Sequence, residues 1–388
     1  MTPPLPRTAV HRIACAIVAA EVRRLRASGQ PAPRTDDWPD ALPIGEQGLG
    51  LDSLEQLGAL GALAETFGLD DAALPEESPQ SVGDWIDWIM HRHGSEGGTL
   101  TVMTSGSTGR PLPCSHGSAE LMAEAQVLAT HVPGRRRVVA LVPAHHLYGI
   151  IWTALLPAVL DIAVVARTIG RPLDLTAGDL VVAVPEQWAA LRRLTRIMPP
   201  DVIGISSAGP LDDALVADLL ASGLSRLLDI YGSSETSGIA IRTCPATHYE
   251  LLPRWHLVPH GESDWQLGDA HGACRDLPDH VERIGARSLR PIGRRDGAVQ
   301  VGGHKVWPAR VADLLQAVEG VAEAAVRLGP DGRLKAFIVP DGSGDPAALA
   351  ARIERAAADR LSAPERPRSL RFGTALPRNM MGKLQDWA

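Results

Sequence analysis

The chain has 388 residues, of which 45% are hydrophobic and 21% are charged, as is typical of a globular protein with two or three domains. A net charge of −7, with no basic patch that interleaves with aromatic residues, argues against nucleic-acid binding, and no apolar run is long enough for a membrane span. The four cysteines lie far apart and form no CxxC pair, which argues against a zinc site or a disulfide framework and indicates a reduced, cytoplasmic protein.

The acidic excess lies in one N-terminal segment. Residues 36–90 contain thirteen Asp or Glu and no Lys or Arg, whereas residues 1–35 carry six Arg against one Glu. From residue 91 onward, 32 basic residues nearly balance 31 acidic ones. This distribution predicts an acidic module attached to a near-neutral enzyme.

Residues 8–92 are predicted to form a small all-α domain. The apolar spacing over residues 9–27 favours an amphipathic helix over an export signal, because His11 and Arg12 interrupt the apolar run. A second helix begins at Ser53 and a last one near Ser81, followed by a linker over residues 93–98. The helix from Ser53 is expected to turn its large apolar side chains inward: Leu54, Leu57, Leu60, Leu63 and Phe67.

The pattern changes at Thr99. Short β-rich runs then alternate with helical runs up to residue 295, which predicts an α/β domain with a largely parallel sheet. The region 296–388 predicts a small α+β unit. Its strands are expected near 299–301, 322–327 and 334–339, and its helices near 308–318 and 345–361.

Two hydroxyl- and glycine-rich motifs each follow a predicted strand. The first, TSGSTG, suits an anion because glycines turn backbone amides toward it and hydroxyls add donors, although a plain surface loop is the alternative. It comprises Thr104, Ser105, Gly106, Ser107, Thr108 and Gly109. In the second, YGSSE, Tyr231 suits ring stacking and Glu235 suits a divalent ion. Lys383, in the polar tail PRNMMGK, is by itself a weak signal.

Together and in this order, these motifs resemble the adenylate-forming superfamily. That superfamily includes acyl- and aryl-CoA synthetases and the adenylation domains of nonribosomal peptide synthetases. The resemblance covers residues 99–388 and implies a shortened adenylate-forming core over 99–295, a mobile C-terminal subdomain over 296–388, and ATP and Mg²⁺ as cofactors.

The resemblance also implies residue roles. TSGSTG corresponds to the phosphate loop, His146 in AHHLYG borders the acyl pocket, and Glu235 holds Mg²⁺ and is counted as catalytic with His146 and Lys383. Further implied roles are nucleotide binding by Gly209, Tyr231, Gly232, Ser234 and Arg294, a hinge at Asp296 and a thiol channel at Gly302 and Gly303. Asp279 is preferred to Asp269 as the ribose ligand, because its spacing to Gly293 matches the family.

The N-terminal unit resembles an acyl or peptidyl carrier domain with four helices. GLDSLE is similar to the attachment motif for phosphopantetheine, which would place a covalent 4′-phosphopantetheine on Ser53. That implies a phosphopantetheinyl transferase and downstream acyl-transferring or condensing enzymes as partners, in secondary metabolite biosynthesis. The alternative is that Asp52 or Ser53 only caps a helix.

The sequence therefore predicts an enzyme that activates a carboxylic acid as an acyl-adenylate and loads it onto a pantetheine thiol. The carrier would be its own or that of a second chain in a homodimer. An acyl- or aryl-CoA ligase that uses free CoA, and a non-catalytic scaffold, are the alternatives. Three departures from the family stand out: the shortened N-terminal part, Leu112 in place of a lysine, and ARV in place of EIE. His146 and nearby small residues suit a flat aromatic or short acyl acid.

Overall fold

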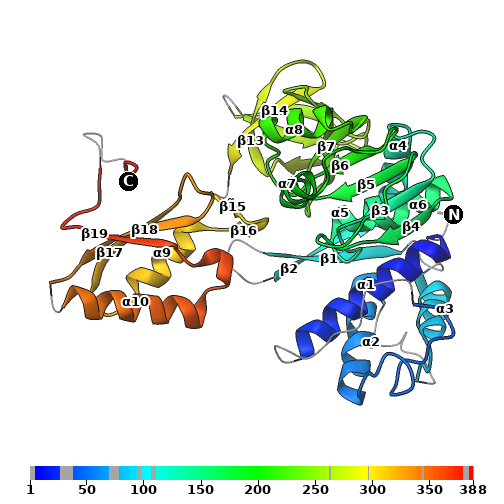
Figure 1. The fold of residues 1–388 in the computed structure, drawn as a ribbon, viewed down its shortest axis with the longest axis horizontal. Helices are drawn as coiled ribbons and strands as arrows, with labels where there is room; N and C mark the ends of the chain where they lie inside the picture. The colour runs from blue at the N-terminus through cyan, green and yellow to red at the C-terminus, as the bar shows by residue number, and fades with distance from the viewer. Residues whose placement is uncertain are drawn as a thin grey trace.

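The computed structural model describes residues 5–26, 38–69, 78–93, 98–105, 111–261, 264–295, 297–342, 345–378 and 384–387. Figure 1 shows the N-terminal helices beneath a large sheet, with a smaller C-terminal subdomain to one side. None of the helices in these ranges is long and apolar enough to cross a membrane.

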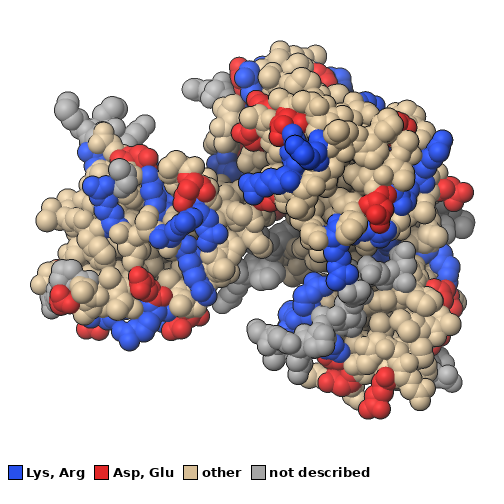
Figure 2. All heavy atoms as spheres, in the orientation of Figure 1, with Lys and Arg blue, Asp and Glu red and all other residues tan. Residues whose placement is uncertain are grey.

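In its described residues, the N-terminal unit has the helices α1 (Arg7–Leu25), α2 (Ser53–Phe67) and α3 (Val82–His93). Helix α2 starts with a capping box, in which the Asp52 carboxylate accepts the amide of Glu55 at 2.8 Å and the Glu55 carboxylate accepts that of Asp52. Acidic side chains line the lower edge of this unit in Figure 2. The expectation that every leucine of α2 points inward is wrong for Leu54 and Leu57, which are each 67% exposed.

The N-terminal helices share their core with the rest of the large unit. Helix α1 packs against α2 and α3 on one side, and against the π-helical segment Ile151–Leu155 and α6 (Leu156–Leu160) on another. One buried apolar cluster extends from Leu5 to Leu289. A separate four-helix carrier domain is therefore not evident, because the apolar surface of α1 is divided between its own helices and the sheet domain.

The large unit is built on a nine-stranded sheet with the order β13-β14-β9-β8-β7-β6-β5-β3-β4. The five strands from β4 to β7 are parallel, and the remaining pairs are antiparallel. The strands span Arg137–Ala140 (β3), Ala163–Ala166 (β4), Asp179–Ala183 (β5), Ile203–Ser206 (β6), Arg226–Ser233 (β7), Ser237–Thr243 (β8), Tyr249–Leu251 (β9), Asp279–Arg283 (β13) and Ser288–Arg294 (β14).

Helices cover both faces of this sheet. Val138 and Leu180 join the cluster that includes α1 and α4, whereas their neighbours Val139 and Val181 join the cluster of α7 and α8. This alternation follows from the period of two in a strand, and it confirms the predicted α/β architecture. The remaining helices of the large unit are α4 (Ser118–Ala129), α5 (Leu147–Ile150), α7 (Pro185–Leu194) and α8 (Asp213–Ala221).

Two smaller sheets flank the large one. Strands β1 and β2 pair antiparallel and stand before and after the predicted phosphate loop in the sequence, and the antiparallel sheet β10-β11-β12 lies beyond β9 in the chain. Their strands are Thr99–Ser105 (β1), Pro111–Gly117 (β2), His256–His260 (β10), Asp264–Gly268 (β11) and Cys274–Asp276 (β12).

The C-terminal subdomain has its own apolar cluster, between the sheet β17-β18-β19 and the helices α9 and α10. Its elements are Val299–Val301 (β15), His304–Val306 (β16), Pro308–Gln316 (α9), Val321–Leu328 (β17), Leu334–Pro340 (β18), Pro346–Arg360 (α10), Ala363–Glu365 (a 3₁₀ turn) and Ser369–Phe372 (β19). These bounds confirm the predicted strands and helices of this region, together with the turn between β17 and β18.

Candidate active site at the carboxyl edge of the sheet

The predicted motifs meet at one edge of the large sheet. Strands β3, β5, β6 and β7 run parallel, so the segments that follow them all lie at their carboxyl edge. AHHLYG follows β3, the segment 206–211 follows β6, and YGSSE occupies the end of β7 and the turn to β8. The topology thus places together three motifs that are distant in sequence.

Tyr231, Asp279 and Arg294 form one cluster at this edge. The Tyr231 hydroxyl donates to Oδ2 of Asp279 at 2.9 Å, and Nη1 of Arg294 lies 3.7 Å from the same oxygen. Asp279 is 8% exposed and pairs with Arg294 across β13 and β14. Burial, with Asp279 beside it, raises the pKa of Tyr231, so its hydroxyl remains a neutral donor. An acceptor beside a guanidinium suits the hydroxyls of a ribose.

The alternative ribose ligand, Asp269, has a different environment. Its carboxylate accepts the amides of His271 and Ala273 at 2.8 and 2.9 Å, in the turn between β11 and β12. These backbone hydrogen bonds lower the pKa of Asp269. Asp269 therefore shapes a turn, and the geometry favours Asp279.

The turn between β7 and β8 presents Glu235. The hydroxyls of Ser233 and Thr236 lie 3.0 Å apart across this turn, and Glu235 is exposed at its tip. A Cβ on Gly232 would lie 2.5 Å from the carbonyl oxygen of Ser237, so this position requires glycine. Ser234, where the family usually has threonine, offers its carbonyl to Nε2–H of His116 at 2.7 Å. That contact ties the turn to β2, the strand that follows the predicted phosphate loop.

A buried ion pair supports this turn from behind. Oε1 of Glu124, on α4, accepts the amide of Gly238 at 3.1 Å, and Oε2 lies 2.8 Å from Nη2 of Arg254. Arg254 also donates to the carbonyl of Thr236 at 2.6 Å. Burial raises the pKa of Glu124, and Arg254 opposes that shift. Sequence reasoning missed both residues, since neither stands in a motif and their contact joins positions 130 residues apart.

Glu235 suits a magnesium ion that is shared with a nucleotide. Within the described ranges, no group of three or more His, Cys, Asp or Glu comes together as a metal cage. Mg²⁺ commonly takes one or two carboxylates and completes its shell with substrate phosphates and water. A single exposed carboxylate at this edge fits that donor set.

His146 caps the short helix α5 beside the site. Its ring lies 4.0 Å from that of His145, centroid to centroid. Burial lowers the pKa of His146, and burial with His146 and Arg23 nearby lowers the pKa of His145 to about 3. Both rings are therefore neutral near pH 7. Tyr148 bridges the ends of two strands through its hydroxyl, which lies 3.0 Å from the Ala183 carbonyl and 3.1 Å from that of Ile205.

The C-terminal subdomain reaches the same edge through the hairpin β15–β16. Nε2 of Gln300 donates to the carbonyl of Ala208 at 3.0 Å, in the segment that also contains Gly209. Gly302 and Gly303 form the turn of this hairpin with φ of 56° and 79°. A Cβ on Gly303 would lie 3.1 Å from Oε2 of Glu186, which follows β5. Of the two predicted thiol-channel glycines, Gly303 thus lies against the large unit, whereas a Cβ on Gly302 would meet no atom within 4 Å.

Several predicted site residues lie outside the described residues: Gly106, Ser107, Thr108, Gly109, Asp296 and Lys383. Thr104 and Ser105 end β1, opposite Leu112 and Pro111 of β2. Leu384 and Trp387 join a small cluster with Phe337 of β18.

Ser53 does not join the edge site. It is the first residue of α2 and is exposed, and Asp52 before it serves as the cap. The main contacts of α2 are with α1, α3 and β1. Its position as the start of a helix is confirmed, but the structure gives Ser53 no place near Glu235 or Tyr231.

A three-layer α/β core, with an α+β subdomain placed against its carboxyl edge, defines the class of adenylate-forming enzymes. Residues 55–264 match the family described as AMP-binding enzyme, and residues 310–383 match the AMP-binding enzyme C-terminal domain. The chain belongs to the AMP-binding enzyme family, and it is an AMP-forming acid–thiol ligase.

Relatives match the chain along its whole length. A protein named 4-coumarate–CoA ligase from Rhodobacter capsulatus is 39% identical over 97% of this chain and 100% of its own length. A protein of the same name from Halorhodospira halophila is 36% identical over 97% of this chain and 98% of its own length. The N-terminal helices are thus shared with proteins named as ligases, and a carrier fusion is not shown.

Solved structures support the fold. An o-succinylbenzoate CoA synthetase from Bacillus subtilis is similar with a TM-score of 0.60 and 19% identity, over 77% of this chain and 72% of that one. An amide bond synthetase from Marinactinospora thermotolerans has the same TM-score with 20% identity, over 80% of this chain and 70% of that one.

Proposed function

We propose that this protein is an acid–CoA ligase that activates an aromatic acid of the 4-coumarate type. The observation that carries the proposal is the full-length similarity to relatives named 4-coumarate–CoA ligase. In this proposal the acceptor thiol belongs to free CoA, and not to a carrier-bound pantetheine as the GLDSLE motif suggested. The exposed Ser53, capped helix start and acidic surface are then features of a structural unit.

The reaction has two steps. A carboxylate oxygen of the acid attacks the α-phosphorus of ATP, and the bond to pyrophosphate breaks. The thiol of CoA then loses its proton and attacks the acyl carbon, and AMP leaves with the electrons of the acyl–oxygen bond. The adenylate is needed because oxide is a poor leaving group, whereas AMP is a good one.

The chain's residues take these roles in the proposal. Tyr231, Asp279 and Arg294 hold the ribose, with the segment around Gly209 beside the adenine. Glu235 would hold Mg²⁺, which supplies charge stabilisation at the phosphates. The loop 104–109 and Lys383 would bind phosphate oxygens, and neutral His146 would border the acyl group. The subdomain 296–388 would turn at Asp296 between the two steps.

The test is a two-stage assay over a panel of aryl, fatty and amino acids. Acid-dependent ATP–pyrophosphate exchange reports the first step, and mass spectrometry of the CoA thioester reports the second. We expect exchange and thioester with 4-coumarate or a close aromatic acid. A fatty or amino acid as the preferred substrate would contradict the substrate class.

Ser53→Ala separates free CoA from a carrier. If CoA is the acceptor, this variant forms the thioester at the wild-type rate, because Ser53 lies on the surface of α2 away from the edge. If acyl groups are loaded onto Ser53, the variant forms no stable thioester. A pantetheine mass shift on wild-type protein treated with a phosphopantetheinyl transferase would support the carrier.

A further inference from the structure

Three polar side chains form a row across neighbouring strands of the large sheet, two residues before Tyr231. Asp229 of β7 lies opposite Arg242 of β8 in the antiparallel register. Tyr249 of β9 follows, with its ring centroid 5.1 Å from the guanidinium carbon of Arg242. Nε of Arg242 and the hydroxyl of Tyr249 both donate to Oδ2 of Asp229, at 2.9 and 2.6 Å. These three residues form one hydrogen-bonded unit, the Asp229 row.

The Asp229 row is buried at a place where apolar side chains would also fit. Asp229 is 2% exposed, and the side chain of Arg242 is 9% exposed. The preceding pair on the same face of the two strands, Leu227 and Cys244, belongs to the apolar cluster of α7 and α8. Burial raises the pKa of Asp229, and Tyr249 and Arg242 oppose that shift. Replacing a buried ion pair with apolar residues is often neutral or stabilising, so stability alone does not account for this row.

The Asp229 row supports the ring of Tyr231. The rings of Tyr249 and Tyr231 lie 5.8 Å apart, centroid to centroid, at an interplanar angle of 53°. Tyr249 is itself held by its hydrogen bond to Asp229 and by the cation beside its ring. Tyr231 in turn donates to Asp279, the proposed ribose ligand. A displacement of Tyr249 would therefore move both the ring and the hydroxyl of Tyr231.

The same row reaches the segment 206–211, which follows β6. Nη2 of Arg242 donates to the carbonyl of Leu211 at 3.4 Å. Nearby, the hydroxyl of Ser207 donates to the carbonyl of Ile230, the residue directly before Tyr231, at 2.9 Å. The segment is thus joined to β7 both through the guanidinium and through a hydroxyl.

We propose that the Asp229 row positions the nucleotide site, because it fixes the ring of Tyr231 and the segment 206–211 relative to each other. The inference rests on the proposed function in taking ATP as the ligand at this edge. In this proposal none of the three residues touches ATP: Tyr249 acts through Tyr231, and Arg242 acts through Tyr249 and the carbonyl of Leu211. ATP then binds to surfaces that are already in place, which avoids the cost of ordering them.

The experiment measures KM for ATP and for the acid by acid-dependent pyrophosphate exchange, and the Kd of ATP by calorimetry without acid. For Arg242→Gln we expect KM and Kd for ATP to rise about tenfold, with KM for the acid at its wild-type value. Tyr249→Phe keeps the ring and the ion pair and loses one hydrogen bond, so we expect a rise of about threefold. A merely structural role would reduce the amount of active enzyme but leave KM and Kd for ATP unchanged.

Arg137→Gln is the matched control. Arg137 forms a comparable buried pair with Asp179, which is 1% exposed and lies 2.9 Å from Nε and 2.6 Å from Nη2 of Arg137. The two residues begin the parallel strands β3 and β5, at the amino edge of the sheet, opposite the site. We expect this variant to lose comparable stability in urea and to keep KM and Kd for ATP at wild-type values.

A double variant tests whether the row acts through Tyr231. Once Tyr231→Ala has removed the ring, Tyr249→Phe should no longer change the Kd of ATP. If the effects of the two substitutions multiply independently, the proposal is overturned. An equal rise in KM for ATP and for the acid would mean a general distortion of the site, and a rise in Arg137→Gln as large as in Arg242→Gln would mean a loss of stability; either result overturns it.

The remaining outcomes separate this inference from the proposed function. Unchanged KM and Kd for ATP in both Arg242→Gln and Tyr249→Phe overturn the role of the row and leave the ligase intact. If Arg242→Gln does not fold, Tyr249→Phe carries the test, since it retains the ion pair. A wild type that binds ATP but shows no acid-dependent exchange contradicts the proposed function, while the Kd values still decide on the row. A wild type that binds no ATP overturns both.

Discussion

At the scale of single residues, nucleotide binding depends on one carboxylate held between a tyrosine and an arginine. Asp279→Asn removes the charge that Arg294 faces at 3.7 Å but keeps an acceptor for Tyr231. We expect KM for ATP to rise about tenfold, which corresponds to about 1.4 kcal/mol of lost binding. Asp269→Asn, in the turn after β11, should leave this KM unchanged. Pyrophosphate exchange at varied ATP measures both, and the reverse ranking would restore Asp269 as the ribose ligand.

The Glu124–Arg254 pair gives a second prediction at this scale. Arg254→Gln leaves a buried carboxylate without its cation, a change that costs about 3–5 kcal/mol of unfolding free energy. Because burial already raises the pKa of Glu124 in the folded state, losing the cation raises it further. The folded variant then holds its proton more tightly than the unfolded chain does. Its stability therefore falls as pH rises from the ordinary carboxyl value of 4.5 through the raised one.

Urea denaturation at pH 5 and pH 8 tests the predicted fall in the stability of Arg254→Gln with rising pH. The double variant Glu124→Gln/Arg254→Gln has no charge to bury, so its loss of stability relative to wild type should not grow between these two values. Equal pH dependence in the single and double variants would show that Glu124 is not the titrating group.

At the scale of elements, local pattern predicted most of what the structure holds. The alternation of β-rich and helical runs predicted the parallel strands, and first-turn prolines marked α9 and α10. The leucines of α2 were assigned inward by period alone, yet Leu54 and Leu57 are exposed because α1 and β1 cover only the other side of the helix. Helical period indicates which residues share a face, but tertiary packing decides which face is covered.

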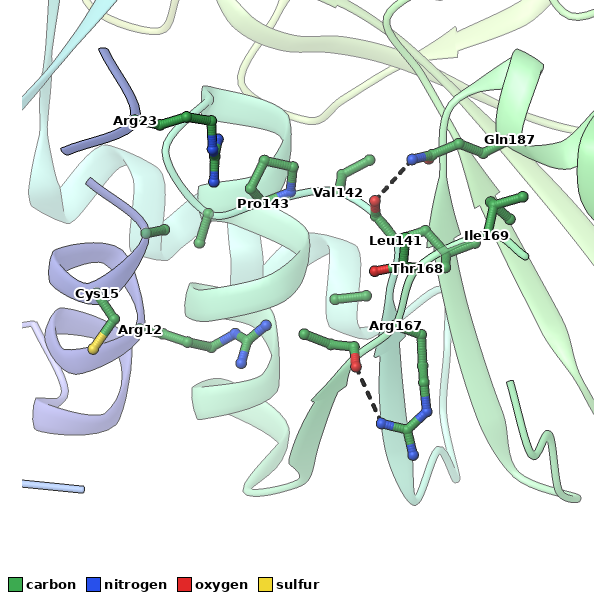
Figure 3. A pocket seen from close by; sticks show the side chains of 14 residues that line it. Arg12, Cys15, Arg23, Leu141, Val142, Pro143, Arg167, Thr168, Ile169 and Gln187 are labelled. Carbon is green, nitrogen blue, oxygen red and sulfur yellow. Dashed lines mark hydrogen bonds between the residues drawn. The ribbon is translucent and has the colours of Figure 1, made fainter. Parts of the chain in front are cut away.

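Some residues of the candidate site could likewise be predicted from local pattern, and others could not. Tyr231, Glu235 and Arg294 stand in recognisable motifs, whereas Glu124 and Arg254 become neighbours only when α4 packs behind β8. A cavity between α1 and the ends of β3 and β4 (Figure 3) could not be predicted either, because α1 and β4 are about 140 residues apart and neither carries a motif. Contacts between distant, unpatterned residues are set by the whole fold.

Gly303, in the turn of the hairpin β15–β16, combines a positive φ with a close neighbour in the large unit. Gly303→Ala would strain a φ of 79° and bring a Cβ to 3.1 Å from Glu186. We expect thioester formation to slow while pyrophosphate exchange stays near wild type, since the proposal assigns this turn to the second step. Gly332→Ala is the matched control: it has a φ of 71° and open space around its Cβ, so it carries only the backbone penalty of about 1–2 kcal/mol. If both variants slowed thioester formation equally, the slowing would come from lost stability and not from the position of Gly303.

At the scale of the whole molecule, the buried clusters divide the chain differently from its charge. Acidic residues set residues 36–90 apart, but one buried apolar cluster joins the N-terminal helices to one face of the large sheet. A second cluster covers the other face, and the C-terminal subdomain has a core of its own. Cooperative unfolding follows shared burial and not charge distribution. We therefore expect α1 to open together with β3 and β5, and the sheet β17-β18-β19 to open separately.

Native-state hydrogen exchange read by mass spectrometry tests this division. Peptides from Arg7–Leu25 and Asp179–Ala183 should show the same opening free energy and the same dependence on denaturant, because Ile13 and Val18 of α1 are buried in the cluster that also holds Leu180 and Val182 of β5. Peptides from Leu334–Pro340 should follow a second, distinct opening. If α1, α2 and α3 opened as one unit while β5 stayed protected, they would form an independent domain, as a tethered carrier would. In that case Arg12 and Arg23 of α1, which line a cavity together with residues at the ends of β3 and β4, could not be held at those strand ends.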